Sequence, residues 1–290
     1  MKPPLFEYLR PNTLEEAIAA RSAHDYSAVL AGGQSLIPTM NFRIANPTVL
    51  IDISRIESLK NLSVEDDQII IGAMVRQRAV ELNNSIYKAN PLVIETLEHV
   101  AHVPIRSRGT VVGSLAHADA AAELPALLIA SGGSVVVQSA SGSRIVEANS
   151  LFKFHMTTTL SHDEIITEVR IPSLKSDSGW AFQEFTRRHG DYAIAGVAVI
   201  LNLASTGECT SISLAACGIA QRAVRLEESE TLLKGTSLDV NSIKDAALAA
   251  KDLVTTADDT HASNEFRRHV LATLLQRAII QAKSRAGKGW

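Results

Sequence analysis

Two short glycine-bearing stretches carry the residue types best suited to holding a ligand. The first, Ala31-Gly32-Gly33-Gln34-Ser35-Leu36, directly follows the apolar run Ala28-Val29-Leu30. The second runs from Thr110 to Asp119, about eighty residues later, and Glu123-Leu124-Pro125-Ala126 follows it. Glycine lets the backbone approach a ligand closely, and successive amides beside small hydroxyl side chains form concavities that bind anions such as phosphate. Two such turns in one chain predict a long ligand held at two places, and a dinucleotide is the first candidate.

The first stretch also fits a purely structural role. An ordinary strand-to-helix turn with Ser35 as N-cap would have the same residues. The stretch is neither a G-x-G-x-x-G fingerprint nor a phosphate loop with Gly-Lys-Ser. Taken alone, it supports an anion-binding turn only weakly.

The second stretch and a later charged turn have similar alternatives. Thr110, Ser114, His117 and Asp119 fit a capped loop in which the polar groups satisfy one another, and His117 with Asp119 gives too few ligands for a metal site. The turn from Arg187 to Ala193 fits a solvated loop, or it places the ring of Tyr192 over a flat cofactor. No spacing indicates a nucleophilic triad, so we predict no catalytic residue and no metal ligand in this chain.

Composition excludes several classes of protein. The 290 residues are 46% hydrophobic with a net charge of −3 and only 4% aromatic residues, which argues against nucleic-acid binding. Cys209 and Cys217 form no C-x-x-C pair, so the chain cannot build a four-thiolate cluster. The longest apolar segment, residues 193–204, is too short for a bilayer and contains Asn202. With no signal-peptide pattern at the N-terminus, a soluble cytoplasmic protein without a membrane span is expected.

Periodicity and turn signals predict an α+β chain in three units. Residues 1–55 contain a capping box at Thr13, a helix over about 14–24 and strands at 28–31 and 48–53. Residues 56–175 contain hairpins around 66–68 and 139–143, helices over about 91–100 and 124–131, and a strand at 164–171. The polar segment 173–179 marks a boundary, and residues 176–290 show three strands, at 181–187, 194–204 and 211–219, followed by helices at about 226–233, 241–254 and 264–284.

Taken together, these stretches resemble one known family, the FAD-binding medium subunit of molybdenum-containing hydroxylases, which includes carbon monoxide, nicotinate, caffeine and xanthine dehydrogenases. The resemblance covers essentially the whole chain. The motifs that match, in order, are Pro11-x-Thr13-Leu14-Glu15-Glu16-Ala17, Ala31 to Pro38, Asn41-Phe42-Arg43, Leu50 to Ile53, Arg106-x-x-Gly109-Thr110-Val111-x-Gly113 to Asp119, Glu123 to Ala126, Arg187-Arg188-x-Gly190-Asp191-Tyr192-Ala193 and Phe266-Arg267-Arg268.

The resemblance implies a fold. Two subdomains, here residues 1–55 and 56–175, would bind FAD between them as in the vanillyl-alcohol-oxidase (PCMH-type) flavin fold. A C-terminal medium-subunit domain, here residues 176–290, would follow with a three-stranded antiparallel sheet and a helical bundle.

The resemblance also implies a set of cofactor-binding residues. The segment Ala31, Gly32, Gly33, Gln34, Ser35, Leu36 and Ile37 would wrap the FAD pyrophosphate. Thr110, Gly113, Ser114, Ala118 and Asp119 would line the opposite side, and Glu123 matches an acidic position near the adenosine ribose. Val103 and Leu160 match apolar positions of the flavin cleft, and Tyr192 matches an aromatic residue beside the isoalloxazine. Gln183 stands where some relatives have a lysine near the flavin, which leaves the flavin potential and the acceptor open.

The function implied is electron transfer within an oxidoreductase complex. A large molybdenum-cofactor subunit would hydroxylate the substrate, a small subunit with [2Fe–2S] clusters would carry the electrons, and FAD here would pass them to an external acceptor, in a dimer of heterotrimers. This chain lacks the insertion and the cysteines with which some relatives hold an extra cluster. Two alternatives stay open at this point: a stand-alone FAD oxidoreductase of the same flavin fold, and a flavin-free scaffold subunit. The substrate of the complex is not encoded in this chain.

Overall fold

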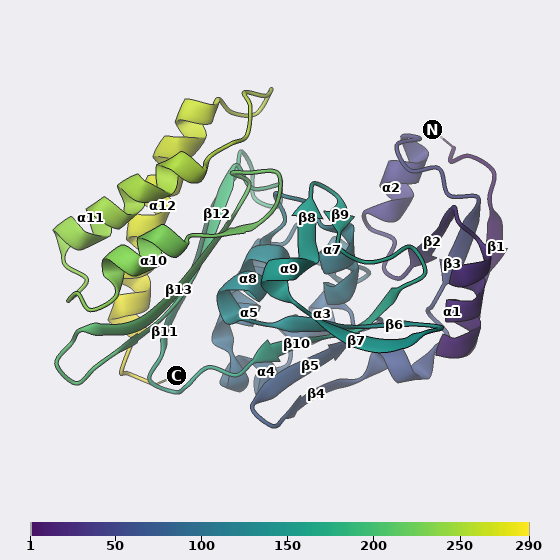
Figure 1. The fold of residues 1–290 in the computed structure, drawn as a ribbon, viewed down its shortest axis with the longest axis horizontal. Coiled ribbons are helices and arrows are strands. Elements are labelled where there is room, and N and C mark those ends of the chain that lie inside the picture. Colours follow the sequence, from purple (N-terminus) through teal and green to yellow (C-terminus); the bar gives the residue numbers. More distant parts are fainter. Residues whose placement is uncertain (1, 290) are drawn as a thin grey trace.

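In the computed structural model, residues 2–289 are described, and they form three units arranged in a row (Figure 1). The N-terminal unit is a three-stranded sheet in the order β1-β3-β2, in which both pairs are parallel. Its elements are β1 (Glu7–Leu9), α1 (Leu14–Ala23), β2 (Ser27–Leu30), α2 (Leu36–Asn41) and β3 (Val49–Asp52). The predicted helix and both predicted strands are confirmed. Strand β1 was not foreseen, and α2 corresponds to the strand-to-helix alternative for the first glycine stretch.

Helix α1 starts at the predicted cap. Thr13 Oγ1 accepts a hydrogen bond from the amide of Glu16 at 3.2 Å, and the Glu16 carboxylate reaches back to the amide of Asn12 at 2.8 Å. These contacts satisfy amides that a helix start leaves unpaired. The start of α1 is therefore fixed by the side chains of its own sequence.

The central unit is a five-stranded sheet in the order β4-β5-β10-β6-β7, with every neighbouring pair antiparallel. Two hairpins supply its outer strands, and in the first the turn residues Asp66 and Asp67 both have positive φ, which this kind of tight turn requires. The strands are β4 (Leu62–Glu65), β5 (Gln68–Gly72), β6 (Ser134–Ser139), β7 (Gly142–Glu147) and β10 (Ile165–Pro172), with β8 (Phe152–Phe154) and β9 (Thr157–Thr158) as a separate pair. The predicted hairpins and the strand before Pro172 are confirmed.

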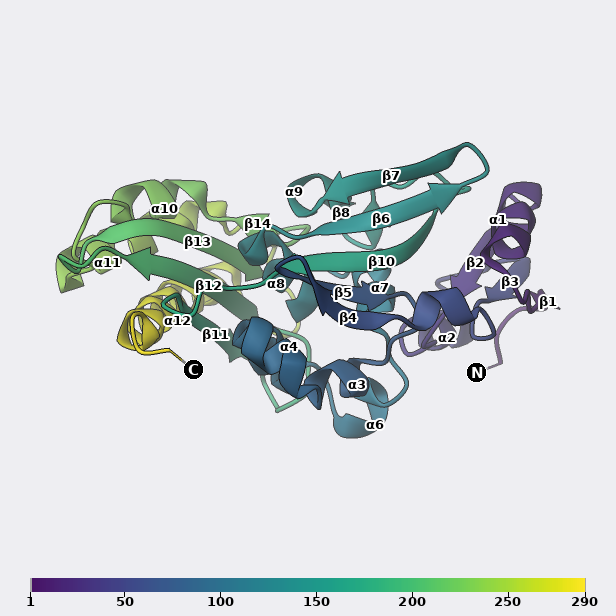
Figure 2. The same cartoon turned by 90° about the horizontal axis from the view of Figure 1, so that it is seen from below.

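Helices fill the chain between β5 and β6 and cover one side of this sheet (Figure 2). They are α3 (Gln77–Glu81), α4 (Asn84–Ala89), α5 (Pro91–His99), α6 (Val103–Arg106), α7 (Val111–His117) and α8 (Glu123–Ser131). The short helix α9 (Ala148–Leu151) follows β7, and a 3-10 turn (Glu57–Lys60) precedes β4. Helices α5 and α8 match the prediction within one residue, whereas the short helices α3, α4, α6, α7 and α9 were not predicted.

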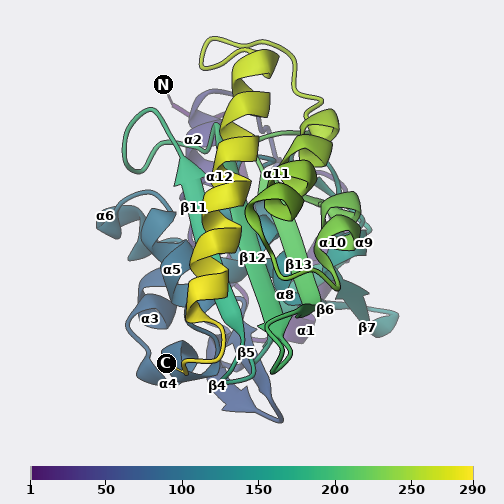
Figure 3. The ribbon, with the colours of Figure 1, turned by 90° about the vertical axis from the view of Figure 1, so that its left-hand side faces the viewer.

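The C-terminal unit is an antiparallel sheet in the order β11-β12-β13-β14 with helices on its outer face (Figure 3). The three long strands agree with the expected fold class, and a two-residue strand extends the edge. The elements are β11 (Gly179–Phe185), β12 (Ala195–Leu203), β13 (Cys209–Cys217), β14 (Val224–Arg225), α10 (Glu227–Leu233), α11 (Val240–Ala249), a 3-10 turn (Ala250–Leu253) and α12 (Asn264–Arg285).

The C-terminal sheet is buried on both faces. Val197, Val199 and Leu201 pack with the helices α10 to α12, whereas Trp180, Phe182 and Cys217 belong to the same hydrophobic core as the central unit. Helix α8 contacts β12 and β13, and α5 contacts β11. The polar segment 173–179 therefore connects two sheets whose facing sides contribute to one hydrophobic core.

Candidate functional site

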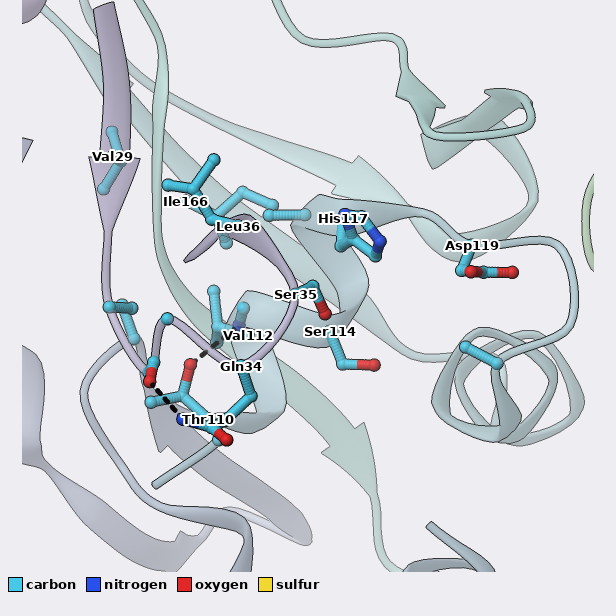
Figure 4. Close-up of a pocket in the computed structure, with 18 of the residues that line it drawn as sticks. Val29, Gln34, Ser35, Leu36, Thr110, Val112, Ser114, His117, Asp119 and Ile166 are labelled. Carbon is cyan, nitrogen blue, oxygen red and sulfur yellow. Dashed lines mark hydrogen bonds between the residues drawn. The ribbon is translucent and has the colours of Figure 1, made fainter. Parts of the chain in front are cut away.

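A cavity of about 600 Å³ lies between the N-terminal and central units and is lined by both glycine stretches (Figure 4). Its walls come from β2 and the turn after it, from α7 and the turn around Gly109, and from the start of β10. The loop residues Gly190, Asp191 and Tyr192 of the C-terminal unit also reach it. A cavity of this size, between units and with both apolar walls and polar groups, is typical of cofactor sites.

The first glycine stretch is pressed against the backbone that leads into the second. A Cβ on Gly32 would lie 2.6 Å from the carbonyl oxygen of Arg108 and 2.7 Å from Cα of Gly109, so no other residue fits there without moving backbone. Gly33 has a φ of +72°, in the left-handed region that favours glycine. The two turns therefore form one continuous wall of the cavity.

This wall offers unpaired amide donors. Within residues 2–289, the backbone amides of Gly32, Gly33, Gln34 and Ser35 donate no hydrogen bond, although all four residues line the cavity. Buried or half-buried amides are normally paired, so a row of free donors facing a cavity fits an anionic ligand. Ser35 precedes α2 without a side-chain capping bond, and Figure 4 shows it next to Ser114 of the opposite stretch.

The second stretch is a short helix rather than the extended turn that its sequence suggests. Thr110 Oγ1 accepts a hydrogen bond from the amide of Gly113 at 3.0 Å and thereby caps α7. A Cβ on Gly113 would lie 2.6 Å from that oxygen, so glycine is needed for the cap. Ala118 ends the helix with a φ of +52°, and Asp119 Oδ1 then accepts the amide of Ala121 at 2.9 Å. This path places Ser114, His117 and Asp119 along the cavity.

The end of the cavity nearest the C-terminal unit is lined by acidic side chains and is partly shielded from solvent. Glu123, the first residue of α8, is 5% exposed. Burial, and secondly the negative charge of Glu184, raise the pKa of Glu123 to about 8. Glu123 therefore holds a proton at neutral pH. Desolvation and then the charges of Asp119 and Glu123 raise the pKa of Tyr192, which lines the same cavity as these acids.

The other end of the cavity lies beside α1 and the start of β10. Arg21 donates to the carbonyl oxygen of Ser27, and His162 and Glu164 complete this end. Glu164 accepts two hydrogen bonds from Arg144, which lower the pKa of its carboxyl. This end is polar and charged, and sequence patterns gave no signal for it because its residues are scattered over α1, β2 and a loop.

Most of the residues expected at the site do line the cavity. These are Ala31, Gly32, Gly33, Gln34, Ser35, Leu36, Thr110, Gly113, Ser114, Asp119, Glu123, Leu160 and Tyr192. Ile37 borders a second, shallower hollow behind the first glycine stretch instead. Val103 and Ala118 do not line the cavity either: Val103 is 45% exposed on α6, and Ala118 is buried at the end of α7.

One expectation about position needs correction. Gln183 does not face the cavity, because its amide binds Gln281 of α12 on the opposite side of β11. Its neighbour Glu184 is the one that faces the central unit. Glu123, which the resemblance places near the adenosine ribose, and Tyr192, which it places beside the isoalloxazine, both line the cavity.

Several lining residues are not among the expected cofactor-binding residues. They include Val29, Gln77, Val112, His117 and Ile166, the last contributed by β10. Burial lowers the pKa of His117, which favours a neutral ring beside the cavity. Among residues 2–289 no group of three potential metal-ligating side chains occurs.

Comparison with known proteins finds family matches over nearly the whole chain. Residues 4–174 match the family model of the FAD binding domain in molybdopterin dehydrogenase, and residues 180–282 match that of the CO dehydrogenase flavoprotein C-terminal domain. The chain belongs to the FAD-binding medium subunits of the molybdenum hydroxylases.

Individual medium subunits are similar in sequence and in structure. The chain is 39% identical to the 6-hydroxypseudooxynicotine dehydrogenase complex subunit alpha of Paenarthrobacter nicotinovorans, covering 99% of this chain and 97% of that one. It is 36% identical to the caffeine dehydrogenase subunit beta of Pseudomonas sp. strain CBB1, covering 98% and 97%. A chain of carbon monoxide dehydrogenase from Hydrogenophaga pseudoflava superposes with a TM-score of 0.96 at 32% identity, covering 99% of this chain and all of that one.

Membership of this family indicates that the protein binds a flavin dinucleotide. The protein is an oxidoreductase subunit that binds FAD, and the molybdenum and iron–sulfur centres of such complexes lie on other subunits. The residues present fit a flavin dinucleotide, because the free amides of residues 32–35 and the hydroxyls of Ser35 and Ser114 line the cavity and are donors of the kind that a pyrophosphate needs. Within residues 2–289, no helix is both long enough and apolar enough to cross a membrane.

Proposed function

We propose that this subunit takes electrons from the [2Fe–2S] clusters of a small partner subunit and passes them through FAD to an external acceptor. FAD, when bound, accepts electrons one at a time and releases them in pairs. The observation that carries the proposal is the cavity itself, which extends from the free amides of residues 32–35 to Tyr192. No nucleophile or metal is needed for this role.

The residues of the cavity have distinct parts in the proposal. The amides of Gly32 to Ser35, with the Ser35 and Ser114 hydroxyls, hold the pyrophosphate. Thr110 and Gly113 shape the facing helix start, and Leu36 and Leu160 provide apolar wall. Tyr192 covers the flavin ring system at the C-terminal end, beside Asp119 and Glu123. Arg21, His162 and Glu164 at the opposite end face the adenosine part.

We also propose the division of the chain into residues 1–55, 56–175 and 176–290, since each range contains one of the three large sheets. FAD then lies between the first two units, and the third closes the flavin end. The partners proposed are a large molybdenum-cofactor subunit and the small subunit, arranged as a dimer of heterotrimers. A cytoplasmic location is consistent with two free cysteines, both buried.

Purification from the native host tests the proposal. The chain should co-purify with an iron–sulfur subunit and a molybdenum subunit, and the complex should contain one FAD for each copy of this chain. A yellow chain without partners would support a stand-alone flavin oxidoreductase instead. A colourless chain in the complex would indicate a scaffold role.

Reduction of the bound flavin tests electron transfer separately. In the intact complex, substrate should bleach the flavin absorption after the iron–sulfur bands, and removal of the small subunit should abolish this bleaching while dithionite still reduces the flavin. Bleaching by substrate without the small subunit would contradict the proposed route.

A further inference from the structure

The motif Phe266-Arg267-Arg268 at the start of α12 is not explained by the cavity, because none of its residues lines it. Arg267 is nevertheless only 5% exposed. Burying a guanidinium is unfavourable unless hydrogen-bond acceptors surround it. The acceptors around Arg267 therefore indicate which parts of the chain it holds together.

Arg267 joins acceptors from three different segments. Its Nη1 donates to the carbonyl oxygens of Ile194 at 2.7 Å and Gly218 at 2.9 Å. Its Nη2 donates to Oδ2 of Asp259 at 2.6 Å, and this carboxylate also accepts two backbone amides of its own loop. Because a guanidinium is planar and its donors point in fixed directions, Arg267 fixes these acceptors relative to one another.

The first of these carbonyls closes the loop between β11 and β12, residues 186–194. The amide of Ile194 donates to the carbonyl oxygen of Phe185 at 2.9 Å, which brings the two ends of the loop together. Phe185 in turn packs edge-on against Phe266, with ring centroids 5.8 Å apart. Two successive residues at the start of α12 thus hold the two ends of this loop.

The middle of the loop reaches the cavity. Gly190, Asp191 and Tyr192 line it, and a Cβ on Gly190 would lie 2.5 Å from the ring of His102 at the start of α6. Gly190 has a φ of +85°, so glycine suits this close approach. Within residues 2–289 the side chain of Tyr192 takes part in no hydrogen bond or ring contact, so the backbone of the loop determines where its ring lies.

The second carbonyl belongs to a residue that is attached to the cavity wall. The amide of Gly218, directly after β13, donates to the carbonyl oxygen of Ala120 at 2.8 Å. Ala120 follows Asp119, which lines the cavity. A Cβ on Gly218 would lie 2.7 Å from the carbonyl oxygen of Ala193, so only glycine fits where the loop meets this segment. Arg267 therefore holds the loop against a point that is anchored beside the cavity.

We propose that Arg267 is a positioning residue for Tyr192, on which it acts through the backbone of Ile194. The inference rests on the proposed function, in which Tyr192 covers the flavin ring system. The guanidinium ties the end of the loop to Gly218 and thereby sets how close the Tyr192 ring lies to the cavity wall. Phe266 supports the other end of the loop.

Hydrogen exchange of the full-length chain without flavin tests the hold on the loop. Arg267→Met occupies similar space but has no donor, so amide exchange within residues 186–194 should become at least tenfold faster than in the wild type. Arg268→Met is the matched control and should exchange as the wild type does, because the Arg268 guanidinium binds Asn264 and the carbonyl oxygen of Val254 rather than the loop. Unchanged exchange in Arg267→Met, or an equal increase in Arg268→Met, would overturn the inference.

The flavin of the intact complex tests whether the loop acts through Tyr192. In Arg267→Met the rate of FAD release and the midpoint potential of the flavin should change in the same direction as in Tyr192→Ala, with release at least fivefold faster than in the wild type. In the double variant both quantities should equal those of Tyr192→Ala alone, because Arg267 has no effect once the ring that it positions is absent. A further change in the double variant would show that Arg267 acts on the fold as a whole, and the inference would be wrong.

Arg267→Lys keeps the test decisive if Arg267→Met does not fold. Lysine keeps the positive charge but lacks the fork that reaches Asp259 and both carbonyl oxygens together. Loop exchange and FAD release should therefore both be faster than in the wild type, and wild-type values for both would overturn the inference. A wild-type complex that contains no FAD would instead contradict the proposed function, whereas the exchange measurement does not depend on flavin.

Discussion

Gly32 packs directly against the backbone of Gly109, the residue that immediately precedes the second glycine stretch. A side chain at position 32 would meet the carbonyl oxygen of Arg108 at 2.6 Å. The contact joins the N-terminal unit to the central unit at the point where the free amides begin. This close approach therefore shapes the cavity wall between the two units.

Substitution of Gly32 by alanine should therefore abolish stable FAD binding. The added methyl group forces the two stretches apart and displaces the free amides of residues 33–35. The FAD content of the purified variant, measured by absorbance after gel filtration, should fall at least tenfold. Gly207→Ala is a matched control: Gly207 has a φ of +86° in a hairpin with no atom near its Cβ position, so the change should cost about 1–2 kcal/mol in stability without loss of flavin. Full flavin retention in Gly32→Ala would contradict the assigned wall.

Substitution of Tyr192 by alanine should weaken FAD retention or shift the flavin potential. It lines the end of the cavity proposed for the flavin and is 62% exposed. Tyr192→Phe keeps the ring and should retain FAD as the wild type does. An absorption spectrum and potential that stay the same in Tyr192→Ala would remove this residue from the site.

The buried carboxyl group of Glu123 predicts how stability depends on pH. Its pKa of about 8 in the folded protein lies above the ordinary value of 4.5, so the native state binds more protons than the unfolded state between these values. Stability contributed by protonated Glu123 is complete below pH 4.5 and is lost as the pH rises toward 8. At about 1.4 kcal/mol per pKa unit, the loss is on the order of 3–5 kcal/mol.

The measurement is the melting temperature of the flavin-free protein between pH 5 and 9. Relative to the wild type, Glu123→Gln should become progressively more stable as the pH rises, because glutamine carries no charge at any pH. A difference between the two proteins that does not vary with pH would show that Glu123 is ionised in the folded state.

Glu95 should be important for the attachment of the C-terminal unit. Its carboxylate accepts the amide of Phe182 at 2.9 Å and an Nη1–H of Arg285 at 2.7 Å, and the Arg285 guanidinium lies 3.7 Å from the centre of the Trp180 ring. Glu95→Ala leaves the amide and the arginine without their partner and should destabilise the protein by about 1–3 kcal/mol, measured by urea denaturation. Glu98→Ala, on the exposed side of the same helix, should have little effect; equal losses in both variants would contradict this role.

The sequence predicted the long elements better than the short ones. Helix α12 and the hairpins have strong caps or turn residues, and their predicted ranges agree with the structure within a few residues. Helices α6 and α7 are only a turn or two long, so no apolar periodicity could develop, and the second glycine stretch was therefore interpreted as a loop. The sequence did contain one signal for α7. Thr110 precedes Gly113 by three residues, which is the spacing at which an N-cap threonine accepts a hydrogen bond from a backbone amide of the helix.

The misplacement of Gln183 has a physical cause. Both faces of β11 are buried, one against the central unit and one against α12, so the strand does not alternate between apolar and polar residues. Without that alternation a sequence does not reveal which residue faces which side, and an error of one position exchanges the faces. The same reasoning explains why Glu184 could not be recognised as a buried acid.

The common core of the two larger units limits how the protein can be recombined. Trp180, Phe182 and Cys217 pack into the hydrophobic interior of the flavin-binding part, so cutting the chain in the linker near Pro172 would expose an apolar sheet face on one fragment and leave α5 and α8 uncovered on the other. A chimera made with another medium subunit would have to exchange these two helices together with the sheet that they cover. The linker is a boundary in the sequence, but it does not divide the molecule into parts that can be transplanted separately.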